Sequence, residues 1–249
     1  KGIEDIIDEI KITMLKPKDI FLLLVVIALT FALVPIGNWA NGVVIFDNLP
    51  QVINKQIAYQ SVTLLATILF LLFLWGVKRK QFREYFKKGN VSAEILPEPI
   101  VGINPKPTEN WYHFGRNFAV IISLVTAVII YFQLLWQNEA SIGNMPPILP
   151  FSIIFALSNA FVEESITRLG VVVVLKGRLR DKTIPLVSAL IFGTVHYWGN
   201  PGGIAGVIVA GFLGWFLAKS ILETRGIFWA WFIHFLQDVI IFSALLAIK

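Results

Sequence analysis

The chain has 249 residues, of which 56% are hydrophobic and 15% charged, and it contains no cysteine. Such a composition excludes an ordinary soluble domain, and the absence of thiols excludes disulfides, cysteine nucleophiles and cysteine-ligated metal sites. The formal net charge of +5 is explained by basic loops on the cytoplasmic side of a membrane protein, so it does not by itself indicate a nucleic-acid partner.

We expect an all-α, polytopic transmembrane helix bundle with about seven spans, or eight if one is hidden near a terminus. Residues 1–19 place isoleucines at helical spacing between acidic residues, which predicts an amphipathic helix on the cytoplasmic membrane surface. Seven apolar segments follow in chain order at about residues 20–36, 57–76, 117–136, 148–175, 185–198, 204–222 and 227–248. The fifth segment is short enough to be re-entrant instead of spanning.

The segments divide the chain into three parts: the N-terminal helix, three N-terminal spans in residues 20–136, and a catalytic-type core of four spans in residues 137–249. The connection at about residues 77–116 is rich in Lys and Arg, whereas residues 137–147 carry neither. Because basic connections stay in the cytoplasm, this alternation predicts an integral multi-pass protein with a cytoplasmic N-terminus. We expect the basic and aromatic residues 80–88 to contact anionic lipid and not nucleic acid.

The fourth apolar segment contains three charged residues, Glu163, Glu164 and Arg168. Placing an ionisable group at membrane depth costs free energy, so such groups are candidates for functional sites. Glu164 and Arg168 are four residues apart, so on a helix they share a face and can form a supporting ion pair. Glu163 points about 100° away from Glu164, which leaves it free for another partner.

Two later apolar segments contain histidines. His196 lies four residues after Phe192, and His234 lies one helical turn before Asp238. A single histidine on an apolar helix is usually a hydrogen-bonded core residue, but a carboxylate together with imidazoles is what water activation requires. Glu163 could take a proton from water with help from His196, and His234 with Asp238 could meet the oxyanion of a tetrahedral intermediate.

The same residues leave other functions open. Glu163, His196 and His234 could bind zinc, although no His-Glu-x-x-His spacing occurs. A proton or ion carrier with Glu163 as the titrating group is a further alternative, but the spans show no clear inverted repeat. A non-catalytic protein could use the polar cluster for packing or docking alone.

Three short motifs carry a resemblance to a known family. They are Glu163-Glu164-x-x-x-Arg168, Phe192-x-x-x-His196 and His234-x-x-x-Asp238. In this order they resemble the motifs of the CPBP family, the CAAX proteases and bacteriocin-processing enzymes also called the Abi family, which are intramembrane glutamate endopeptidases related to the Rce1-type prenyl-protein peptidases. The similarity covers about residues 150–242.

The resemblance implies a membrane endopeptidase that needs no metal or other cofactor. Its substrate would be a membrane-associated peptide or lipidated protein, such as a prenylated CAAX-like tail or a leader peptide. By position, Glu163 and His196 would activate water, and His234 and Asp238 would form the oxyanion site. Glu164, Arg168 and Phe192 would have supporting roles.

One position departs from the Rce1-type pattern, which typically has Asn where this chain has Asp238. An ionised Asp cannot donate a hydrogen bond to an oxyanion, so Asp238 would have to be protonated or to orient His234. Some family members act mainly as partners of other membrane proteins. A non-catalytic membrane partner or immunity protein on the same scaffold is therefore the alternative function.

Overall fold

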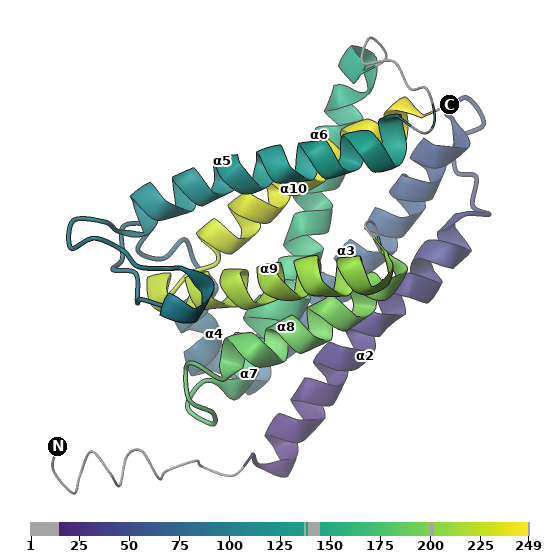
Figure 1. Cartoon of the computed structure of the whole chain (residues 1–249). Coiled ribbons are helices and arrows are strands. Elements are labelled where there is room, and N and C mark those ends of the chain that lie inside the picture. Colours follow the sequence, from purple (N-terminus) through teal and green to yellow (C-terminus); the bar gives the residue numbers. More distant parts are fainter. Residues whose placement is uncertain (1–14, 137, 139–144, 200–201, 249) are drawn as a thin grey trace, which may run out of the picture.

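The computed structural model describes residues 15–136, 138, 145–199 and 202–248, and these residues form a bundle of helices (Figure 1). The longer helices are α2 (Pro17–Ala40), α3 (Gln51–Val77), α5 (Trp111–Ile130), α6 (Met145–Glu163), α9 (Gly203–Thr224) and α10 (Phe228–Ala247). The shorter ones are α4 (Arg79–Tyr85), η1 (Pro99–Val101), η2 (Tyr131–Leu135), η4 (Glu164–Leu169), α7 (Gly170–Leu175), α8 (Ile184–Val195) and η5 (His196–Trp198).

Six helical stretches among the described residues are long and apolar enough to cross a membrane. They are Pro17–Ala40, Gln51–Val77, Trp111–Leu135, Pro147–Leu175, Gly203–Thr224 and Phe228–Ala247. The expectation of an all-helical, multi-pass membrane protein is thus confirmed. The sequence-based count of seven or eight spans is not, because the fifth apolar segment forms only the short stretch Ile184–Trp198. Its 12-residue helix α8 is about 18 Å long, well below the bilayer's hydrocarbon thickness of about 30 Å.

The amphipathic helix expected at the N-terminus falls mostly in residues 1–14, which lie outside the described residues. The first span begins earlier than expected, at Pro17, and therefore includes the last residues assigned to that amphipathic helix. Proline is favoured in the first turn of a helix because its missing N–H would have no partner there. The division of the chain at residues 136 and 137 stays a prediction.

The polar fourth span is not a regular α-helix. It runs as α6, then the π-helical turn η4, then α7, and every residue of η4 is buried. A π-helical turn shifts the direction of the side chains that follow it, and such turns occur often at functional sites. The sequence predicts a continuous α-helix here and does not reveal this turn. The turn begins between Glu163 and Glu164 and so separates the two carboxylates.

Helices α8 and α9 pack at very short range, antiparallel to each other (Figure 1). A Cβ atom built on Gly193 would lie 2.8 Å from the carbonyl oxygen of Val207 and 3.0 Å from Cα of Gly211. Only glycine fits at such a contact, as in other close helix pairs of membrane proteins. Helix α10 packs against both α6 and α5. This arrangement brings the residues of α6, α8 and α10 together in the middle of the bundle.

The basic connections gather at one end of the bundle. Asp19, in the first turn of α2, pairs with Lys78 after α3 and lies 2.8 Å from Nε of Arg178 after α7. The backbone N–H of Asn90 donates to the carbonyl of Thr224 at the end of α9, at 2.7 Å. The loops that the sequence assigns to the same side of the membrane therefore meet in space. Which side of the membrane they face stays a prediction.

Candidate active site

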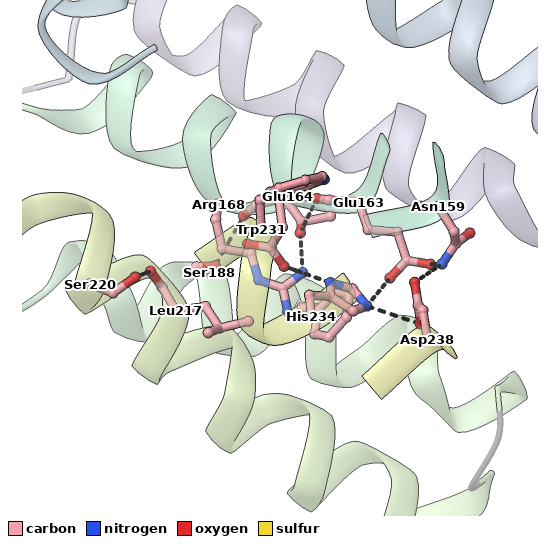
Figure 2. Close-up of polar contacts among 12 residues, drawn as sticks. Asn159, Glu163, Glu164, Arg168, Ser188, Leu217, Ser220, Trp231, His234 and Asp238 are labelled. Carbon is pink, nitrogen blue, oxygen red and sulfur yellow. Dashed lines mark hydrogen bonds and ion pairs between the residues drawn. The ribbon is translucent and has the colours of Figure 1, made fainter. Parts of the chain in front are cut away.

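Two adjacent glutamates occupy different environments at the junction of α6 and η4 (Figure 2). Glu164 is completely buried, and its Oε1 lies 3.2 Å from Nη1 of Arg168 and 2.7 Å from Nδ1 of His234. The expected pairing of Glu164 with Arg168 is thus present. The side chain of Glu163 keeps 13% of its surface exposed. Its Oε2 atom has no hydrogen-bond partner within the described part of the chain.

His234 on α10 lies between carboxylates from two helices (Figure 2). Its Nδ1 atom is held by Glu164, whereas Nε2 lies 3.7 Å from Oε2 of Glu163 and 3.5 Å from Oδ1 of Asp238. Both Nε2 distances exceed those of a good hydrogen bond. A carboxylate oxygen only accepts, so the 2.7 Å contact places a proton on Nδ1. The Nε2 side of the ring faces Glu163 and Asp238 without a tight partner.

Asn159 completes this group of polar residues. It lies one helical turn before Glu163 on α6, and its Nδ2 atom is 3.1 Å from Oε1 of Glu163 and 3.0 Å from Oδ2 of Asp238. No motif in the sequence includes Asn159. Its spacing of four residues before Glu163 is the signal that could have identified it, since residues i and i+4 share a helix face.

Phe192 and Arg168 support the site from α8 and η4. The guanidinium carbon of Arg168 lies 3.3 Å from the ring centroid of Phe192, so the cation stacks on the ring. The Phe192 ring also lies 4.0 Å from the ring of His196 and 6.0 Å from that of His234, measured between centroids. Phe192 thus contacts side chains of all three motifs.

His196 begins η5, directly after α8, and its Nδ1 lies 2.9 Å from the carbonyl oxygen of Phe192. Because a carbonyl can only accept, Nδ1 must donate, and in the neutral ring Nε2 is then an acceptor. No hydrogen bond or ion pair joins the described side chains of His196 and Glu163. Both residues nevertheless line the same two cavities.

The two cavities meet at the site. One, of about 280 Å³, lies between α2, α3 and α8, and its wall includes the polar residues Asn38, Lys55 and Tyr59. The other, of about 230 Å³, is lined by mainly apolar residues of α5, α9 and α10. Glu163, Phe192, His196, Gly199 and Phe242 line both. Glu163 therefore has access to two spaces of different polarity.

The side chains that could act as metal ligands give no support to the zinc alternative. Among the described residues, no three His, Asp or Glu side chains are placed so that they could hold one metal ion. Nδ1 of His234 is directed at Glu164 and Nδ1 of His196 at a backbone carbonyl. The histidines are thus oriented by neighbouring oxygen atoms, and each ring has only Nε2 left for another partner.

Comparison with known proteins gives one match. Residues 144–240 match a family described as type II CAAX prenyl endopeptidase, Rce1-like. The matched segment begins one residue before α6, ends within α10 and includes all three motifs. No curated protein and no solved structure gives a significant match.

Proposed function

We propose that the protein is an intramembrane, metal-independent glutamate endopeptidase, and the premise is the match of residues 144–240 to the Rce1-like family of type II CAAX prenyl endopeptidases. The observation that carries the proposal is the environment of Glu163. Its Oε2 atom is free of hydrogen bonds within the described part of the chain, while Oε1 is held by Asn159. A carboxylate that is oriented through one oxygen and has no hydrogen-bond partner at the other is suited to act as a general base.

In the proposed reaction, a water molecule donates one hydrogen bond to Oε2 of Glu163 and one to Nε2 of His196. Glu163 takes a proton from this water, and the oxygen of the water attacks the carbonyl carbon of the substrate. The C–N bond of the tetrahedral intermediate then breaks, and Glu163 returns the proton to the leaving amine. The access of both residues to the same two cavities supports this arrangement.

His234 is proposed to stabilise the oxyanion through Nε2. Since Nδ1 already donates to Glu164, Nε2 carries a hydrogen only when the ring is an imidazolium. Glu163, Glu164 and Asp238 surround the ring and would stabilise that cation by Coulomb attraction. In this scheme Asp238 acts by orienting His234, so it need not donate a hydrogen bond itself.

The proposed substrate is a membrane-associated peptide or lipidated protein, such as a prenylated CAAX-like tail or a leader peptide. The apolar cavity between α5, α9 and α10 would receive a lipid or an apolar side chain, and the cavity beside α2 and α3 a more polar part of the chain. A substrate that extends from one cavity into the other passes Glu163.

We place the N-terminus and the basic end of the bundle in the cytoplasm, as the positive-inside rule favours.

The test uses purified protein in detergent with a fluorogenic prenylated peptide and a set of leader-type peptides. Wild type, Glu163→Gln and His196→Ala are compared, each with and without a strong chelator. We expect cleavage by wild type, loss in both variants, and no effect of the chelator. Cleavage abolished by the chelator would favour zinc instead, and no cleavage of any peptide would favour the non-catalytic membrane partner.

A further inference from the structure

Asn159 connects two carboxylates that come from different helices. Its side-chain nitrogen carries two hydrogens and has two acceptors within reach, Oε1 of Glu163 on α6 at 3.1 Å and Oδ2 of Asp238 on α10 at 3.0 Å. Asn159 is 8% exposed and Asp238 4% exposed. The amide therefore links two acidic groups, the buried Asp238 and the partly exposed Glu163, that would otherwise repel each other.

Gln60, on a third helix, lies beside the oxygen atom of this amide. Nε2 of Gln60 on α3 lies 3.5 Å from Oδ1 of Asn159, and Oε1 of Gln60 accepts a hydrogen bond of 2.9 Å from Ser158. Gln60 is itself buried, with 5% of its surface exposed. The oxygen of Asn159 thus faces α3, and its nitrogen faces the two carboxylates. A rotation of the amide by half a turn would lose both hydrogen bonds to them.

The second oxygen of each carboxylate faces His234. Oε2 of Glu163 and Oδ1 of Asp238 lie 3.7 and 3.5 Å from the same atom, Nε2 of His234. Asn159 binds the carboxylate oxygens that point away from the His234 ring. It therefore also sets the direction of the two oxygens that face the ring. Resting on the function proposed above, we propose that Asn159 is a positioning residue, which holds Glu163 and Asp238 on either side of His234 Nε2.

The first test removes the amide without adding charge. Asn159→Leu has a similar size but no donor, and loss of a hydrogen bond to a charged group predicts a kcat about ten- to a hundred-fold lower. KM should stay within about twofold, because Asn159 acts through Glu163 and not through the substrate. The matched control is Ser152→Ala on the same helix, which removes a hydroxyl that donates to the carbonyl oxygen of Ile148 and to no carboxylate, and it should keep the kcat of wild type.

A second test does not need activity. In protein labelled with ¹⁵N-asparagine, the amide signal of Asn159 is identified by its loss in Asn159→Leu. Glu163→Gln should shift one of its two proton resonances and Asp238→Leu the other, because each proton is bound to a different carboxylate. The inference is overturned if neither resonance responds to these changes.

The two proposals fail in different ways. If wild type cleaves no peptide, the proposed endopeptidase fails, and the positioning role fails with it. If wild type cleaves but Asn159→Leu keeps its kcat, only the positioning role is wrong. A variant that melts at lower temperature with kcat unchanged would likewise assign Asn159 a structural role alone and overturn the inference.

Discussion

Nδ1 of His234 lies 2.7 Å from Oε1 of Glu164, which joins α10 to the π-helical turn η4 across 70 positions of sequence. The same oxygen lies 3.2 Å from Nη1 of the completely buried Arg168. Glu164 therefore supplies the negative charge for a buried cation and also orients a histidine. Its neighbour Glu163 has no such ion pair with Arg168. We therefore expect a Glu→Gln substitution to change stability at position 164 and activity at position 163.

Glu164→Gln should destabilise the protein, because it leaves Arg168 as a buried charge without its partner. Removing one member of a buried pair costs about 3–5 kcal/mol of unfolding free energy. Thermal unfolding in detergent measures the loss. Glu163→Gln is the matched control and should melt close to wild type while losing activity. Equal melting of the two variants would contradict this division of roles.

Phe192→Leu should weaken the support of the site without removing an ionisable group. The ring of Phe192 stacks on Arg168 at 3.3 Å, and a buried cation–π contact of this kind contributes about 2 kcal/mol. We expect a lower melting temperature together with a lower kcat, since His196 and His234 also pack near this ring. A variant with the melting temperature of wild type would show that the stacking contributes nothing measurable.

Gly193→Ala should separate α8 from α9, because the new methyl group would meet backbone atoms at 2.8 and 3.0 Å that cannot move aside. Overpacking of this type costs about 1–3 kcal/mol, and the shift of α8 would displace His196 and lower activity. Gly211→Ala on the facing helix is the control. Its new Cβ would have no contact closer than 3.6 Å, so melting temperature and cleavage rate should both stay near wild type.

Asp238→Asn tests whether this position must be acidic. An asparagine can still accept from Asn159 through its oxygen, and its amide could donate to an oxyanion. We expect cleavage to stay within about tenfold of wild type, whereas Asp238→Leu, which can neither accept nor donate, should lose about a hundred-fold or more. Equal loss in both variants would show that the charge of Asp238 is required. Initial rates with the same fluorogenic peptide measure the difference.

The orientation in the membrane can be tested cleanly because the chain contains no cysteine. Lys106→Cys places a thiol in the basic connection, and Asp47→Cys places one in the loop between α2 and α3, at the opposite end of the bundle. Both native residues are exposed. A membrane-impermeant maleimide should label position 47 from outside intact cells and position 106 only in inverted vesicles. The reverse pattern would contradict a cytoplasmic N-terminus.

Much of the architecture follows from the sequence alone. Long apolar runs interrupted by basic loops predict a multi-pass helical membrane protein, because a lipid environment leaves the backbone few alternatives to the helix. The pairing of Glu164 with Arg168 is also predictable, since a spacing of four residues fixes their relation on a helix. The three motifs with Glu163, His196 and His234 indicate which helices hold the candidate site, and the family match over residues 144–240 agrees with them.

Only the tertiary structure decides which partner each of these side chains takes. Helix spacing cannot show that His234 binds Glu164 from another helix, or that Asn159 bridges Glu163 and Asp238. The π-helical turn at Glu164 and the short α8 also depend on packing against neighbouring helices. Contacts between distant residues arise from how the helices dock, and docking is set by shape complementarity across the whole bundle, which local periodicity does not encode.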